Sequence, residues 1–158
     1  MNSEADFIFL HKAVELALEA EKVGNLPIGS VITFNNEIIA AAGNSMLLPH
    51  FDPGRHAEMN ALDLVPVHLW KHAAEMTCYT TLEPCCMCFS RMLLSGIGRI
   101  VYGATDTQGG CSCLTSHLPP FYHAGNTPVL TGPLLPEICD PLFERAKQIF
   151  NQLEEVRN

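Results

Sequence analysis

Apolar side chains near the start of the chain fall three or four positions apart, and the period then changes to that of strands. Between residues 7 and 18 this spacing predicts a helix that ends at Gly24. Residues 28–34 and 37–42 are two strand-like runs joined by Asn35-Asn36, a pair typical of a tight hairpin turn. The chain is therefore expected to open with a helix followed by a β-hairpin.

Helices and strands alternate along the rest of the chain. A turn at Asp52-Pro53-Gly54 predicts a helix that begins near Arg55 or His56 and is broken by Pro66. The later segments are a strand at 76–82, a helix at 86–95, strands at 99–103 and 129–131, and a helix at about 138–155. This order predicts an α/β fold, a three-layer α/β/α sandwich with a mixed, mostly five-stranded sheet. No linker composition interrupts it, so a single domain over residues 1–158 is expected.

Composition and charge narrow the function classes. Apolar residues make up 47% and charged residues 16%, which is typical of a compact globular protein. The longest stretch without an Asp, Glu, Lys or Arg, residues 107–136, contains five Pro and four Gly, so no membrane span is predicted. No secretory signal precedes the first helix, and a cytoplasmic location is expected. A net charge of −8 with scattered basic residues argues against a nucleic-acid partner, although a local basic patch stays possible.

Seven cysteines without a signal peptide favour metal binding and buried thiols over a disulfide framework. Two of them belong to the metal motif described next. For the other five the expected role is that of a small buried apolar side chain: Cys78, Cys86, Cys111, Cys113 and Cys139. Cys111-Ser112-Cys113 is also compatible with redox chemistry or a second metal, but no further ligand pair supports either role.

Two short motifs carry the candidate chemistry: His56-Ala57-Glu58 and the segment from Pro84 to Cys88, Pro-Cys-Cys-Met-Cys. One His and two Cys, Cys85 and Cys88, supply three metal ligands. A structural zinc site is normally closed by four protein ligands, whereas a catalytic site leaves one position for water. Thiolate and imidazole donors select zinc over calcium, magnesium or manganese. The motifs therefore predict one catalytic Zn²⁺ per chain.

Both motifs are expected at helix N-termini, where the helix dipole favours thiolates. Glu58 has no evident structural role, and it lies two residues from the His ligand. We expect it to take a proton from the metal-activated water and to deliver it to a substrate nitrogen and a leaving amine. The other interpretation of Glu58, a solvated carboxylate in the first helical turn, does not explain the accompanying ligand set.

Residues 10–102 resemble the zinc-dependent nucleoside and nucleotide deaminases, in the branch of bacterial tRNA adenosine deaminase, guanine deaminase and fungal-type cytosine deaminase. The motifs that carry the resemblance are Leu-Pro-Ile-Gly at 26–29, Gly-Asn at 43–44, His-Ala-Glu at 56–58, Tyr-Thr-Thr-Leu-Glu-Pro-Cys at 79–85 and Ile-Gly-Arg-Ile-Val-Tyr-Gly-Ala at 97–104. The resemblance implies a hydrolytic deaminase of cytidine-deaminase-like fold. It also implies a substrate contact from Asn44, whose other interpretation is a turn residue, and makes Pro27, Ala57 and Glu83 further candidates for substrate contacts. Asp106, just before the loop that follows, is a candidate either for a substrate contact or for capping a turn.

The chain departs from the family pattern in several places, of which two bear on its partners. Phe89-Ser90-Arg91 follows the second Cys ligand, where the family has small residues at a subunit contact. The family resemblance predicts a homodimer or larger homo-oligomer, and the long Arg91 leaves its geometry open. The basic tail common in bacterial tRNA deaminases is also absent.

The segment 107–128 is long for a loop without regular structure, and such loops are often functional. Its Leu114, Phe121, Tyr122 and His123 are candidates either for stacking on a base or for packing the loop. Three functions remain. The sequence favours a hydrolytic deaminase of a free base or nucleoside, followed closely by a tRNA wobble-adenosine deaminase. A non-catalytic zinc-stabilised module comes third.

Overall fold

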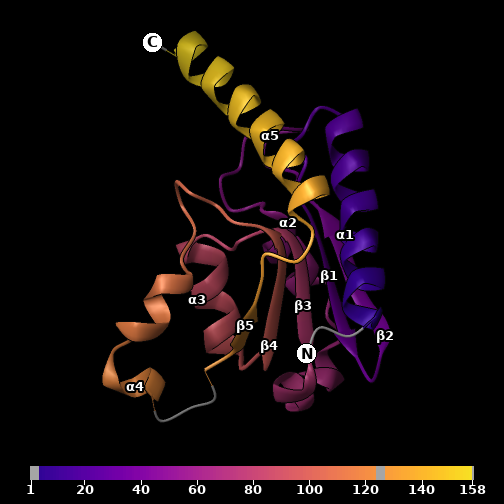
Figure 1. Ribbon diagram of the computed structural model, residues 1–158, viewed down its shortest axis with the longest axis vertical. Helices are drawn as coiled ribbons and strands as arrows, with labels where there is room; N and C mark the ends of the chain where they lie inside the picture. Colours follow the sequence, from indigo (N-terminus) through magenta and orange to yellow (C-terminus); the bar gives the residue numbers. More distant parts are fainter. Residues whose placement is uncertain (1–3, 124–126, 158) are drawn as a thin grey trace.

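The structure is a computed structural model that describes residues 4–123 and 127–157, without the side chains of 123 and 154–157 (Figure 1). Its strands are β1 (Gly29–Phe34), β2 (Glu37–Gly43), β3 (Thr77–Leu82), β4 (Arg99–Ala104) and β5 (Val129–Thr131). Its α-helices are α1 (Glu4–Lys22), α2 (Ala57–Asp63), α3 (Cys86–Ser95), α4 (Pro120–His123) and α5 (Pro136–Arg157). Two 3₁₀ helices complete it, η1 (Val67–Glu75) and η2 (Ser112–Ser116).

The five strands form one mixed sheet in the order β2-β1-β3-β4-β5. The pairs β1/β2 and β1/β3 are antiparallel, whereas β3/β4 and β4/β5 are parallel. Asn35 and Asn36 adopt φ values of 52° and 60°. Asn tolerates this left-handed conformation, and two such residues in a row make the tight turn of a hairpin. The predicted β-hairpin is therefore confirmed.

Helices cover both faces of the sheet, which gives three layers. Val31 of β1 and Val101 of β4 pack in a core with α1 and α5, whereas their neighbours Ile32 and Ile100 pack in a second core with α2 and α3. Adjacent residues face opposite sides because the side chains of a strand alternate. Figure 1 shows α1 and α5 on one side of the sheet and α3 on the other. The expected α/β/α sandwich is confirmed.

The topology brings distant segments to one edge of the sheet. Because β3 and β4 are parallel, Leu82 pairs with Ala104 at their carboxyl ends. Glu83 N continues this pairing by donating to Ala104 O over 2.8 Å. The segments that follow each strand, Pro84 onward and Asp106 onward, therefore lie side by side. Ligand sites in open α/β sheets are common at this edge.

The structure corrects the expected role of two cysteines. Cys86 and Cys111 form a disulfide, with their Cα atoms 5.3 Å apart. The adjacent backbone explains why these two cysteines meet. Cys111 N donates to Pro84 O over 3.0 Å, and Cys85 and Gly110 form an isolated antiparallel β-bridge. This long-range contact has no local sequence signal. Of the other three, Cys78 and Cys139 are buried as expected, whereas Cys113 is exposed.

The segment 107–128 is less irregular than expected, because it contains η2 and α4. Residues 124–126 of this segment lie outside the described part of the chain. The 3₁₀ helix η1, after Pro66, was not predicted. Among the described helices none is both long and apolar enough to cross a membrane.

A glycine holds the first helix against the sheet, and its replacement should destabilise the fold. A Cβ atom on Gly29 would lie 2.0 Å from Ala13 O and 2.7 Å from Ala17 N of α1. Because these are backbone atoms, α1 must shift, and we expect Gly29→Ala to lower the unfolding free energy by about 3 kcal/mol. Urea denaturation measures this. Gly54→Ala is the control, since the nearest atom there is a side-chain oxygen of exposed Asp52 at 3.1 Å. Equal stability of the two variants would contradict the prediction.

Candidate active site

The metal-binding motifs lie at the starts of two helices, as the sequence predicts. His56 is the N-cap of α2 and Cys85 the N-cap of α3, both with extended backbone. Neither N-cap side chain makes a capping hydrogen bond, so the imidazole and the thiol are free to face each other. Cys88, one turn into α3, is buried. The free N–H groups at both helix starts favour negative charge in the space between them.

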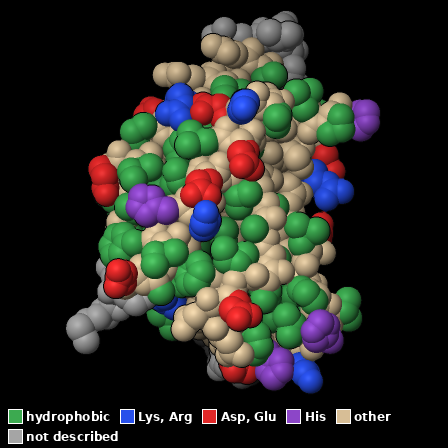
Figure 2. Space-filling model, turned by 90° about the vertical axis from the view of Figure 1, so that its right-hand side faces the viewer, with side chains coloured by type: hydrophobic (Ala, Val, Ile, Leu, Met, Phe, Trp, Pro, Cys, Tyr) green, Lys and Arg blue, Asp and Glu red, His purple; other side chains and the backbone are tan. Residues whose placement is uncertain are grey.

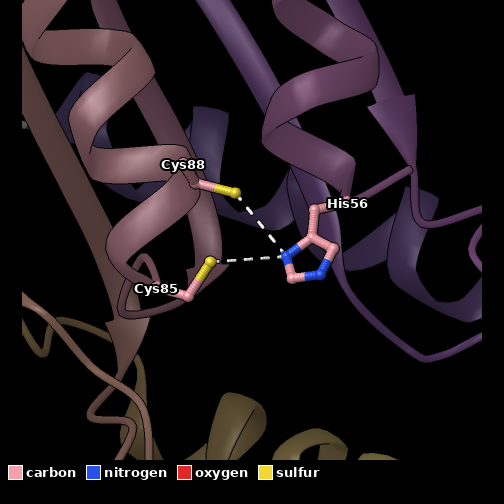
Figure 3. Close-up of side chains that lie close together, drawn as sticks. All are labelled: His56, Cys85 and Cys88. Carbon is pink, nitrogen blue, oxygen red and sulfur yellow. Dashed lines mark hydrogen bonds between the residues drawn. The ribbon is translucent and has the colours of Figure 1, made fainter. Parts of the chain in front are cut away.

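Three donor atoms converge in that space (Figure 3). His56 Nδ1 lies 3.5 Å from Cys85 Sγ and 3.6 Å from Cys88 Sγ, and all three donors lie within 4.8 Å of one another. Tetrahedral Zn²⁺ with ordinary Zn–S and Zn–N bonds separates sulfur from nitrogen by roughly 3.6 Å. The observed spacing is therefore that of zinc ligands, and the donor set fits this ion.

The two thiols differ in charge. Hydrogen bonds from Cys88 and then from His56 lower the pKa of Cys85 to about 4. The pKa of Cys88 is raised, because its proton is shared with Cys85 and because it is buried near Glu58. The hydrogen bond to Cys85 also raises the pKa of His56. The lowered pKa of Cys85 favours one thiolate in the pair, and a metal ion would favour the second.

Glu58 faces the ligands from inside the protein. It is 3% exposed; its Oε1 accepts a hydrogen bond from Thr80 Oγ1 over 3.0 Å, and its Oε2 lies 3.5 Å from Cys88 Sγ. Burial raises the pKa of this carboxyl above its usual range. A buried carboxyl with a raised pKa, beside a metal site but not needed as a ligand, can both accept and donate a proton.

A cavity of about 350 Å³ opens onto the metal ligands, within the range of small-molecule sites. His56, Glu58 and Cys85 form its polar end, and Glu83, Asp106, Gln108 and Gly109 form one wall. Leu26, Ile28 and Leu82 form an apolar wall. The candidate residues Glu83 and Asp106 thus lie at the cavity.

The sequence reasoning missed the wall that α5 contributes. Phe143, Ala146, Lys147, Phe150 and Asn151 of this helix line the cavity. They recur three and four residues apart, so one face of α5 covers the opening. The period was visible in the sequence. Nothing local indicated that this face lies against Leu26 and Ile28, more than a hundred residues away.

Three other candidate residues are buried and are not among those that line the cavity. Pro27 is buried between two lining residues, and Ala57 is fully buried between His56 and Glu58. Asn44 is 3% exposed; its Oδ1 accepts from Met46 N over 3.0 Å, while its Nδ2 has no hydrogen-bond partner among the described residues. An unpaired buried amide is costly and marks a place where a ligand atom can bind.

The candidate stacking residues of the 107–128 segment do not line the cavity where the structure describes their side chains. Leu114 and Tyr122 pack against the core beneath α3, and Phe121 is exposed. None of the three lines the cavity, and the side chain of His123 lies outside the described part. The contacts of Leu114 and Tyr122 match the packing role, whereas the start of the same segment, Gln108 and Gly109, reaches the cavity.

Three convergent ligands beside a buried carboxyl, on an α/β/α sandwich, define a hydrolase-type zinc site. The family model of the cytidine and deoxycytidylate deaminase zinc-binding region matches residues 3–104. The chain therefore belongs to this family of zinc-dependent deaminases.

Several curated proteins are similar to this chain in sequence. The tRNA-specific adenosine deaminase of Buchnera aphidicola subsp. Baizongia pistaciae is 41% identical over 102 residues, 64% of this chain and 62% of that protein. The enzyme of the same name from Bacillus subtilis is 40% identical over 108 residues, 68% of this chain and 66% of its own length. The chain thus spans less than two thirds of either enzyme. A probable cytosine deaminase of Schizosaccharomyces pombe is 32% identical over 127 residues, 76% of this chain and 74% of that protein.

A solved structure is also similar to this chain. A chain from a study of A-to-I editing by tRNA:A34 deaminases at the wobble position superposes with a TM-score of 0.74 and 26% identity. The match covers 86% of this chain and 99% of that one. The likeness therefore extends beyond the region that the family model matches.

Proposed function

We propose that this protein is a hydrolytic deaminase that converts adenosine to inosine in a tRNA. The observation that carries this proposal is the 40–41% identity to two enzymes named tRNA-specific adenosine deaminase. The sequence alone favoured a free base or nucleoside on the ground of the acidic net charge. Because identity at the level of these relatives outweighs net charge, the order of the two candidates is reversed.

The residues of the site can divide the chemistry of hydrolytic deamination. A Zn²⁺ ion held by His56, Cys85 and Cys88 would supply a Lewis acid that lowers the pKa of water. Glu58 accepts one proton of the attacking water at a carboxylate oxygen and delivers it to the ring nitrogen. It then takes the proton of the newly added hydroxyl group and delivers it to the amine, which leaves as ammonia while the C=O bond forms. Its raised pKa suits both steps, and Thr80 holds the carboxyl in place. We assign the unpaired Nδ2 of Asn44 to the bound base as a donor, although Asn44 is not among the residues that line the cavity.

The residues of α5 that line the cavity favour a nucleotide within an RNA strand, and not a free base, as the substrate. Phe143, Lys147 and Phe150 follow one another at helical spacing, and Lys147 Nζ lies 4.8 Å from the centre of the Phe143 ring. Aromatic side chains stack on unpaired bases, and the Lys147 ammonium, which pairs with exposed Glu144 over 2.6 Å, can exchange this partner for a phosphate. A small free base inside the cavity has no need of these groups at its opening.

The surface charge limits how the RNA can bind. On the face that bears α1, Lys and Arg side chains are scattered among acidic and hydrophobic ones and form no continuous patch (Figure 2). With a net charge of −8, few phosphates can be neutralised. We therefore expect RNA binding to depend only weakly on salt, with a slope equivalent to about one to three phosphates.

The second candidate is a deaminase of a free base or nucleoside. The 32% identity to a probable cytosine deaminase, over three quarters of both chains, and the acidic charge favour it. A cavity of about 350 Å³ also has room for a base or nucleoside. The two candidates share the metal site and Glu58, so only the substrate separates them.

A substrate panel tests the proposal. We expect the zinc-loaded protein to form inosine in an anticodon stem-loop with adenosine at the wobble position, at least about 100-fold faster than it releases ammonia from free adenosine, cytosine or guanine. The same stem-loop with adenosine moved one position along the loop is the control. Lys147→Ala should raise KM for the stem-loop.

Two other results of this panel would favour a different function. Turnover of a free base or nucleoside with an unreactive stem-loop would contradict the tRNA proposal and identify a small-molecule enzyme. No turnover of any substrate by protein with one bound zinc would favour the non-catalytic module.

A further inference from the structure

Residues 106–112 form a strap along one wall of the cavity. Asp106, Gln108 and Gly109 of this strap line the cavity. Asp106 Oδ1 accepts hydrogen bonds from the backbone N–H groups of Gln108 and Gly109, both over 2.9 Å, so the first turn of the strap is internally fixed. The place of the strap as a whole must be set from outside this turn.

Glu83 joins the two ends of the strap. Its Oε2 accepts from Asp106 N over 3.2 Å, and its Oε1 accepts from Ser112 N over 3.1 Å. The side chain is 5% exposed, and no ion pair involving Glu83 occurs among the described residues. A buried carboxylate without a cationic partner is costly unless hydrogen bonds stabilise it. Both oxygens accept from the backbone, so the contacts of Glu83 within the protein support a role in holding the strap.

The strap is shaped to lie on this carboxylate. A Cβ atom on Gly110 would lie 2.5 Å from Glu83 Cδ and 2.6 Å from Asp106 O. Only glycine allows the backbone to pass so close. The strap also touches the metal-binding segment, through the Cys85–Gly110 bridge and the Cys86–Cys111 disulfide. Its contacts to Glu83 therefore set the distance between the strap residues at the cavity and the metal ligands.

We propose that Glu83 is a positioning residue, whose carboxylate holds the strap so that Asp106 and Gln108 meet the substrate. This inference depends on the proposed function at one point, namely that the substrate binds in the cavity. Loss of the carboxylate would remove one hydrogen bond at each end of the strap without touching a metal ligand, while the Cys86–Cys111 disulfide would still join the strap to α3. Substrate binding should then suffer more than the chemical step.

Glu83→Ala tests this with three measurements. We expect one zinc per chain, as in the wild type, and amide hydrogen exchange at least about tenfold faster in 106–112 but unchanged in α3. KM should rise about tenfold while kcat stays within about threefold. Glu83→Gln should fall between, because its amide keeps one oxygen acceptor for one of the two N–H groups. Glu37→Gln, on the exposed hairpin, is the charge control.

A double-mutant cycle adds a test of the contact itself. Gly110→Ala should give the same faster exchange and higher KM. Combining it with Glu83→Ala should cost less than the sum of the two single effects, because only the contact of the added Cβ with Asp106 O then remains. Unchanged exchange in Glu83→Ala, or faster exchange with an unchanged KM, would overturn the proposal, as would loss of zinc. Exchange needs no substrate, and KM is measured on whichever substrate the wild type turns over, so failure of the tRNA proposal remains a separate result.

Discussion

Glu58→Gln should lose turnover while keeping both the metal and the fold. Glutamine has nearly the same volume as glutamate, and its carbonyl oxygen can still accept the hydrogen bond from Thr80. It cannot accept or deliver a proton, which is the task assigned to Glu58. Since a positioned acid or base contributes about 10² to 10⁴ in rate, and this group acts twice, we expect kcat to fall by about 10³-fold or more.

The metal should be unaffected, because Glu58 is not among the three convergent donors. Zinc content is measured on the purified variant by mass spectrometry, and the thermal transition is recorded beside it. Glu19→Gln, on an exposed position of α1, removes the same charge far from the site and should be indistinguishable from the wild type. Thr80→Val removes only the hydrogen bond to the carboxyl and should cost about tenfold.

The outcome separates two roles of the carboxyl. If kcat falls and zinc stays, Glu58 carries protons. If zinc is lost with activity, the carboxyl supports the metal ligands through its contact with Cys88, and the proton transfer must be assigned elsewhere. Full activity of Glu58→Gln would contradict the mechanism, whichever substrate the enzyme uses.

Local patterns predicted most of the fold. The Asn35-Asn36 turn, the helix end at Gly96 and the alternation in the strands are each determined by residues close in sequence. Likewise, His56 and Cys85 each follow turn or strand signals that place them at a helix start. The metal site was predictable because its ligands come in two short motifs whose helix positions follow from local rules.

The walls of the cavity could not be predicted in the same way. Phe143 and Ile28 line the same cavity, and Cys86 is bonded to Cys111, only because the sheet order and the packing of α5 bring these segments together. Periodicity shows that a helix has an apolar face, but it does not show what that face will contact. The hydrogen bonds of Glu83 could not be predicted for the same reason, since its partners are backbone groups 23 and 29 residues away.

Removal of a single metal ligand should have the other large effect. In His56→Ala or Cys85→Ala two donors remain, and two donors cannot hold Zn²⁺ against solvent as three can. Loss of residues that merely orient ligands costs 10–100-fold in metal affinity. We therefore expect loss of a ligand to weaken zinc binding by more than about 100-fold, and the purified variants to contain little or no zinc.

Stability should follow the metal. An ion that binds the folded chain stabilises it in proportion to the logarithm of its affinity, so both variants should melt at the temperature of the chelator-treated wild type. Cys113→Ala removes an exposed free cysteine, and His50→Ala removes an exposed imidazole. Both are matched controls and should retain one zinc per chain. Because Cys86 is bound to Cys111, it is not free to replace Cys85. A full complement of zinc in Cys85→Ala would therefore show that the three donors are not the ligand set.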